Sequence, residues 1–274
     1  MQSALLLLRL QRVPQSTIHL LLGTNHKAVE NMETKICRLR QAYVEKEEKK
    51  IVFGNAKTWV DVEADEATFD KRDISEVPHL RHLIVKPKDT IMWEQWAGII
   101  QRGKPHTLVL GKLSPKLTRT RAPGPGAIRK TEWKTIANQI LVNRKVVLHT
   151  DSAKSYKLKM PGVIHDRVVH CKKRIKVNGV YRWTSPKYVN LVTHNIPGTK
   201  KKLRVISGTQ IVDRAWRFLK DRLKINQNTK AGTRALKAKL RSAQYDYWMK
   251  NSDLWLATGD LCSEALKKCY PEAC

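Results

Sequence analysis

The chain has 274 residues, and its 53 Lys or Arg against 24 Asp or Glu give a formal net charge of +29. Such a charge excludes an enzyme of small neutral substrates, which has no use for so strong a field, and it indicates a polyanionic partner, nucleic acid above all. The 41% of hydrophobic residues and the eight Trp exclude a disordered basic tail and predict a sizeable folded core.

The cysteines and the N-terminal residues bear on the cellular compartment. The five cysteines have irregular spacings and no Cys-x-x-Cys pair, which argues against a disulfide framework and against a zinc ribbon. The apolar run 4–8 is too short to span a bilayer or to form the core of a signal peptide. We therefore expect a protein that is neither secreted nor membrane-bound, located in the nucleus of a eukaryotic host or otherwise in the cytoplasm and nucleoid.

The first 50 residues predict three helices. Their approximate ranges are 3–12, 15–22 and 25–43. The second ends at Gly23, a natural helix C-cap, and the third has apolar residues every three or four positions on one face. Two helices joined by a short Gly-containing turn predict a helix-turn-helix module, with His26 and Lys27 among the residues that face DNA. A helical hairpin that only dimerises is the alternative.

From residue 51 the pattern changes to strands and one helix. The predicted strands are 51–53, 59–67, 92–100, 106–110 and 145–149. A helix is predicted from Thr131 to Leu141. The strand that follows this helix contains three consecutive apolar residues, as a buried central strand does. Antiparallel strands, a helix and then a buried strand predict a mixed α/β sheet flanked by helices.

Three aspartates stand where elements of this domain end or begin. Asp65 lies at the end of the strand 59–67, Asp151 directly follows the buried strand, and Asp213 precedes an amphipathic helix. Carboxylates that converge cannot all stay ionised without cations, and two Mg²⁺ ions, with Mn²⁺ as a substitute, would resolve the repulsion. Two such ions can promote in-line phosphoryl transfer. The sequence therefore predicts that these aspartates are catalytic residues and metal ligands.

The positive charge is concentrated in residues 167–250, which hold 22 Lys or Arg against three Asp. Asn178-Gly179 predicts the type I′ turn of a β-hairpin over 175–183, within a basic insertion at 172–206. The residues of this insertion that we expect to contact DNA are Lys172, Lys173, Arg174, Lys176 and Arg182. Interleaved aromatic side chains suit stacking on a base or sugar, whereas an exposed solubilising hairpin is the alternative.

The segments around the three aspartates resemble the three catalytic blocks of DDE transposases. The segments are 62–66, 149–152 and 210–220, and the closest group is the ISXO-two-like insertion-sequence transposases. The resemblance covers about residues 51–250 and implies an RNase H-like fold. In that family a basic residue follows the third acid by seven positions, as Lys220 follows Asp213 here, and the resemblance implies that Lys220 binds a phosphate of the transposon end.

The resemblance also implies a function and a domain plan. A helix-turn-helix module over 1–50 would precede a catalytic domain over 51–250 and a C-terminal tail over 251–274. The implied activity is Mg²⁺-dependent cleavage at transposon ends and strand transfer into target DNA, carried out by a homodimer or higher oligomer on double-stranded DNA. Two alternatives stay open: a catalytically inactive or domesticated transposase-derived DNA-binding protein, and a basic RNA-binding or ribosome-associated protein.

Overall fold

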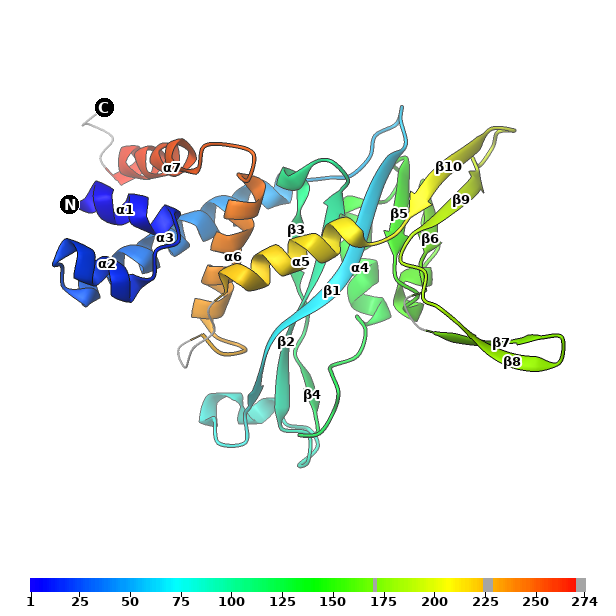
Figure 1. The fold of residues 1–274 in the computed structure, drawn as a ribbon, viewed down its shortest axis with the longest axis horizontal. Helices are drawn as coiled ribbons and strands as arrows, with labels where there is room; N and C mark the ends of the chain where they lie inside the picture. Colours follow the sequence, from blue (N-terminus) through cyan, green and yellow to red (C-terminus); the bar gives the residue numbers. More distant parts are fainter. Residues whose placement is uncertain (170–171, 224–228, 270–274) are drawn as a thin grey trace. The chain divides into compact units, whose positions relative to one another are not determined.

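The computed structural model divides the chain into two compact units (Figure 1). It describes residues 1–169, 172–223 and 229–269. The helical unit consists of Met1–Lys50 together with Asp221–Cys274, and the sheet unit consists of Ile51–Lys220. Each unit therefore has its own packing.

The helical unit is built from both ends of the chain. Residues 221–250 group with the N-terminal helices and not with the sheet. This grouping arises because α6 (Arg234–Trp248) packs along α3 (His26–Glu47). The C-terminal segment 251–274 also contains a helix, α7 (Leu254–Cys269).

The helical unit begins with two short helices, α1 (Gln2–Leu10) and α2 (Gln15–Leu22). Gly23 ends α2 in the left-handed conformation, with φ of 59°, which is the C-cap that the sequence predicts. The side chain of Asn25 then caps α3 by accepting a hydrogen bond from the backbone N–H of Lys27 at 2.8 Å. The described helices include none that is long and apolar enough to cross a membrane.

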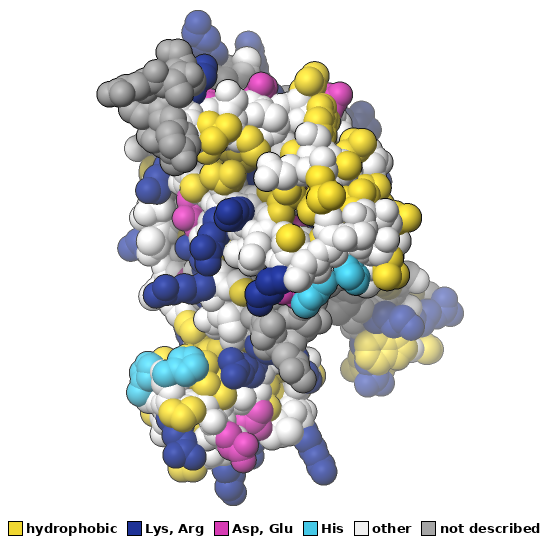
Figure 2. All heavy atoms as spheres, turned by 90° about the vertical axis from the view of Figure 1, so that its left-hand side faces the viewer, with side chains coloured by type: hydrophobic (Ala, Val, Ile, Leu, Met, Phe, Trp, Pro, Cys, Tyr) yellow, Lys and Arg dark blue, Asp and Glu magenta, His cyan; other side chains and the backbone are white. Residues whose placement is uncertain are grey.

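The core of the helical unit is small, and part of its apolar surface is exposed. Leu5, Ile18 and Val29 form a buried cluster among α1, α2 and α3. Hydrophobic side chains also gather on the face shown in Figure 2, over α1, α2 and α7. The exposed large hydrophobic residues of these helices are Leu7, Leu20, Leu21, Trp255, Leu256 and Leu266.

The sheet unit contains a six-stranded mixed sheet, so the mixed α/β class predicted from the sequence is confirmed. Its strands are β1 (Val60–Asp73), β2 (Ile91–Gln101), β3 (Val109–Lys112), β4 (Lys116–Thr118), β5 (Val146–Thr150) and β6 (Val163–Arg167). The order is β3-β2-β1-β5-β6, with β4 paired to β2. The β1–β2 and β2–β3 pairs are antiparallel, whereas β1–β5 and β5–β6 are parallel.

Helices cover both faces of this sheet. On one face, Trp133 and Ala137 of α4 (Lys130–Ile140) join a buried cluster with Val62, Ala64 and Leu148 of the strands. On the other face lies α5 (Gln210–Arg222), whose Trp216 contacts the sheet. The alternation of side chains along β1 therefore sends even-numbered residues to α4 and odd-numbered residues to α5.

Two of the predicted strands differ from the structure. Residues 51–53 form no strand, because Phe53 is buried in the core cluster while its N–H bonds the carbonyl oxygen of Ile140 at the end of α4. At 106–110, a single 3₁₀ turn (Pro105–Thr107) comes first and β3 begins at Val109. In both segments, 51–53 and 106–110, apolar side chains are buried in the core although the backbone does not form a complete strand ladder.

The basic insertion forms two hairpins. β7 (Lys173–Val177) pairs with β8 (Val180–Thr184), and β9 (Asn190–Asn195) pairs with β10 (Lys202–Ser207). Asn178 and Gly179 have φ of 49° and 82°, as a type I′ turn requires, and the predicted hairpin is confirmed. In Figure 1 the β7–β8 ribbon extends away from the six-stranded sheet.

Candidate functional site

Two of the three aspartates lie just beyond the point where β1 and β5 stop pairing. Glu63 of β1 and His149 of β5 form the last pair of this parallel ladder, and two residues further on are Asp65, still within β1, and Asp151, just after the end of β5. Asp65 is not at the end of β1, as the sequence predicted, but in its middle, because β1 continues along β2 to Asp73. It lies near the point where β5 ends, and the charge of Asp151 contributes to the raised pKa of Asp65, so the two carboxylates are near each other.

The third aspartate comes from the helix α5. Asp213 is exposed in the first turn of α5, and its Oδ2 accepts a hydrogen bond from the Thr209 hydroxyl at 3.2 Å. One turn later, the indole N–H of Trp216 donates to Oδ2 of Asp65 at 3.1 Å. Lys220 is exposed near the C-terminal end of the same helix. A hydrogen bond thus links α5, which carries Asp213, directly to Asp65 on β1.

The charges of Asp151 and Asp213 act on Asp65. Burial, and then the negative charges of Glu66, Asp213 and Asp151, raise the pKa of Asp65 from 3.8 to about 7, against a lowering hydrogen bond from the Glu66 backbone. Burial is the largest of these causes, so Asp65 behaves mainly as a desolvated carboxylate, and neighbouring negative charges add to the effect. Among the described residues, however, no three His, Cys, Asp or Glu side chains form a group arranged to hold a metal ion.

The donor set nevertheless has the chemistry that Mg²⁺ requires. All three side chains offer carboxylate oxygens, the ligand type that hard divalent cations take. Asp65 and Asp151 are partly buried and Asp213 is exposed, so solvent reaches the cluster. Asp151 is also held in place, because its Oδ1 accepts the backbone N–H of Ala153 at 2.8 Å. The residues therefore fit magnesium by ligand type.

An ion pair between the buried Glu63 and the half-buried Arg102 fixes the start of α5 over the sheet. Oε2 of Glu63 accepts the backbone N–H groups of Ile211 and Val212 at 2.7 and 3.0 Å. Its Oε1 accepts from Nε of Arg102 at 2.7 Å, and Arg102 also donates to the carbonyl oxygen of Gly208 at 2.9 Å. A carboxylate at a helix N-terminus is stabilised by the helix dipole. Sequence reasoning missed this contact, which joins residues almost 150 positions apart.

A second polar network lies on the same face, next to Asp151. The imidazole of the fully buried His149 bridges two carboxylates, Asp61 and Asp166, each at 2.8 Å. Oδ2 of Asp166 is also 3.1 Å from Nε2 of His194 on β9, and its Oδ1 accepts the hydroxyl of Ser207 on β10. The network therefore ties the β9–β10 hairpin to the edge of the sheet.

Burial and these hydrogen bonds have opposite effects on the pKa of Asp166. Burial would raise the pKa of Asp166, but the hydrogen bond and charge of His149 and the hydrogen bonds from Ser207 and His194 outweigh it and hold the pKa below 3.8. Sequence reasoning did not single out Asp166. The available signal was the pair Val163-Ile164 after Gly162, which indicates the short parallel strand that carries it.

The residues predicted to contact DNA are exposed wherever the structure describes them. On the insertion these residues are Lys172, Arg174, Lys176 and Arg182. The side chain of Lys173 lies outside the described part of the chain. In the helical unit, His26 and Lys27 are exposed in the first turn of α3, where Glu30 lies 3.3 Å from His26 and 3.9 Å from Lys27. Both regions are thus accessible to a polyanion.

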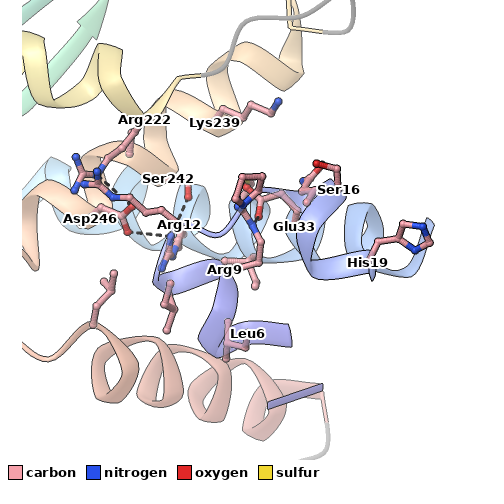
Figure 3. A pocket seen from close by; sticks show the side chains of 18 of the residues that line it. Leu6, Arg9, Arg12, Ser16, His19, Glu33, Arg222, Lys239, Ser242 and Asp246 are labelled. Atoms are coloured by element: carbon pink, nitrogen blue, oxygen red, sulfur yellow. Dashed lines mark hydrogen bonds and ion pairs between the residues drawn. The ribbon is translucent and has the colours of Figure 1, made fainter. Parts of the chain in front are cut away.

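The helical unit also contains a cavity of about 880 Å³ (Figure 3). Ion pairs line it: Glu33 lies 2.6 Å from Arg9, and Asp246 lies 3.0 Å from Arg40 and 3.6 Å from Arg222. Because these pairs join α1 to α3 and α3 to α6, they account for the charged lining as helix-to-helix contacts. None of the three predicted catalytic aspartates lines the cavity.

Comparisons of this chain with known protein families, with curated proteins and with solved structures find no match.

Proposed function

We propose that this protein is a DDE-type DNA transposase that cleaves phosphodiester bonds at transposon ends and transfers the freed 3′ ends to target DNA. The observation that carries the proposal is the placement of three acids. Asp65 lies on β1, Asp151 directly follows the adjacent parallel strand β5, and Asp213 lies in the first turn of the helix that contacts Asp65 through Trp216. No comparable arrangement is needed for DNA binding alone.

Mg²⁺ is the expected cofactor, and Asp65, Asp151 and Asp213 are the residues that would hold it. When bound, two such ions would activate the attacking oxygen and stabilise the leaving oxygen of the scissile phosphate. The chain's own residues orient the site. Trp216 holds the carboxylate of Asp65 by a hydrogen bond, and the exposed ammonium of Lys220 would bind a phosphate of the transposon end.

The strand order supports an RNase H-like catalytic domain. Three antiparallel strands, β1 to β3, are followed by two parallel strands, β5 and β6, with helices on both faces. The helices α2 and α3, joined at Gly23, would form the helix-turn-helix module, with His26 and Lys27 toward the DNA. A homodimer or higher oligomer on double-stranded DNA completes the proposal, with action in the nucleus of a eukaryotic host or otherwise at the nucleoid.

The test is a nicking assay on supercoiled plasmid that carries the sequences flanking the coding region. Purified protein with Mg²⁺ or Mn²⁺ should convert the plasmid to the nicked form, and EDTA should stop the reaction. Asp151→Asn should reduce the rate by orders of magnitude because it removes a ligand charge. Asp260→Asn, an exposed acid on α7, is the matched control and should cut normally. Nicking that survives Asp151→Asn would refute the assignment.

A catalytically inactive, transposase-derived DNA-binding protein is the second candidate. Its support is that the third acid is Asp213, which is one methylene shorter than the Glu that the resembled transposases usually have. Such a protein would bind the flanking DNA with the same affinity in Mg²⁺ and in EDTA, and it would cut in neither. Tighter binding in Mg²⁺ together with nicking would favour the transposase.

A further inference from the structure

The β7–β8 ribbon has two chemically different faces. In its register, Arg174 pairs with Trp183 and Lys176 pairs with Tyr181, so these four side chains share one face. We call this the aromatic face. The opposite face carries the pairs Ile175 with Arg182 and Val177 with Val180. The alternation of a strand thus places every aromatic side chain of the ribbon on one side.

The aromatic face is open to solvent and positively charged. Trp183 is 68% exposed and Tyr181 is 56% exposed, values far from those of core aromatic residues. The guanidinium carbon of Arg174 lies 4.1 Å from the centre of the Tyr181 ring, and Nζ of Lys176 lies 5.8 Å from it. No Asp or Glu occurs between Arg167 and Val212, so nothing in this stretch of sequence neutralises the face.

Exposed rings and exposed cations recognise different parts of a nucleic acid. Phosphates need only the cations, and duplex DNA offers phosphates along its whole length. Flat rings gain by stacking on a base, and in an intact duplex the faces of the bases are already covered by their neighbours. Two large exposed rings beside two cations are therefore suited to bases that are no longer paired.

We infer that the aromatic face binds unpaired nucleotides of DNA, with Trp183 and Tyr181 stacking on bases and Arg174 and Lys176 contacting the adjoining phosphates. Strand cleavage and transfer expose such nucleotides at the ends of the element, so the choice of DNA rests on the proposed function. The stacking itself rests only on the ribbon. Because the rings contact bases and the cations contact phosphates, we expect the affinity for single-stranded DNA to depend on the rings. The affinity for duplex DNA should depend on the positive charge alone.

The experiment compares full-length variants in fluorescence-anisotropy titrations at one fixed salt concentration. The probes are a labelled single-stranded oligothymidine and a labelled blunt duplex, both in EDTA, so that cleavage cannot interfere. Trp183→Ala should weaken binding of the single strand by about 5- to 150-fold, the cost of one lost stacking contact, and should change duplex binding by no more than about twofold. Trp183→Phe should recover most of the loss, because it keeps a ring.

Val180→Ala is the matched control, since Val180 is 60% exposed on the opposite face of the same ribbon. It should leave both affinities unchanged. Equal losses on single strand and duplex for Trp183→Ala would overturn the inference, as would a Val180→Ala loss as large as that of Trp183→Ala. Tighter, ring-dependent binding of a matching RNA strand would overturn the choice of DNA.

The binding titrations and the nicking assay test different proposals, so one proposal can fail while the other stands. A protein that never cuts, but whose single-strand binding depends on Trp183, would refute the transposase proposal and support the stacking role. A protein that cuts normally, but binds single strands equally well with Trp183→Ala, would refute the stacking role and leave the transposase proposal standing.

Discussion

At the scale of single residues, Asp166 is a strongly constrained side chain of the sheet unit. It is 6% exposed and accepts hydrogen bonds from three elements: His149 on β5, His194 on β9 and Ser207 on β10. A buried carboxylate of this kind is stabilising only while its partners are present, because an unpaired buried charge is costly. Its position next to the strand that leads to Asp151 makes it a structural support of the candidate site.

The lowered pKa of Asp166 predicts a pH dependence of stability. Because its folded-state pKa lies below 3.8, its contribution is present above that pH and is lost as the pH falls through the lower folded value. Asp166→Asn should therefore reduce the free energy of unfolding by about 1–3 kcal/mol near neutral pH, with a smaller difference from the wild type below about pH 4. Urea denaturation at several pH values measures this. A difference that grows toward acid pH would contradict the prediction.

At the scale of elements, the docking of α5 on the sheet decides whether a site exists. Glu63 holds the first turn of the helix, and Trp216 packs over Gly98, the cross-strand partner of Asp65. A Cβ at residue 98 would collide with the indole of Trp216, so only glycine allows this approach. The same contact brings the indole N–H to Asp65. The packing of Trp216 on Gly98 therefore also sets the position of its hydrogen bond to Asp65.

Gly98→Ala tests this docking. The added methyl group should displace Trp216 and reduce the free energy of unfolding by about 1–3 kcal/mol, as overpacking of a dense contact does. It should also slow nicking, if the proposed function holds, because Asp65 loses its hydrogen bond from the indole. Gly124→Ala is the matched control, since a Cβ there meets no atom within 4 Å. Equal melting temperatures of Gly98→Ala and wild type would contradict the predicted contact.

At the scale of the whole molecule, the net charge of +29 governs association with nucleic acid. The excess is uneven, because residues 167–250 hold 22 of the 53 Lys and Arg and only three acids. This segment includes the β7–β8 ribbon, the β9–β10 hairpin and α5 with Lys220. Binding by such a surface releases counterions from DNA, and its affinity must fall as salt rises.

A salt titration of duplex binding measures this property. With about 6–10 phosphate contacts, the affinity should fall by about 10³- to 10⁵-fold between about 50 and 200 mM salt. Replacing the exposed Lys200, Lys201 and Lys202 by Gln should lower the slope of log affinity against log salt by about 1 for each phosphate contact that is lost. An affinity that is nearly independent of salt would show that the charge has another role.

Local sequence was enough to predict the features that depend on neighbouring residues. Gly23 ends a helix, Asn178-Gly179 makes the turn of a hairpin, and the apolar run before Asp151 is the buried strand β5, which lies between β1 and β6. Each of these follows from the conformational preference or periodicity of a few consecutive residues. The sequence also showed acids near the predicted ends of strands and the start of a helix, and this pattern led to the three candidate aspartates.

Only the tertiary structure decided which distant residues meet. It placed residues 221–250 with the N-terminal helices, Glu63 at the start of α5, and Asp166 between two histidines. Strand register, side-chain parity and helix packing determine these contacts, and no local pattern encodes which residues of different elements meet. The charge of +29, visible from the sequence, indicated the kind of partner. The proximity of Asp65 to Asp151 and to Asp213 on α5, which the fold alone produces, supports a reaction on that partner.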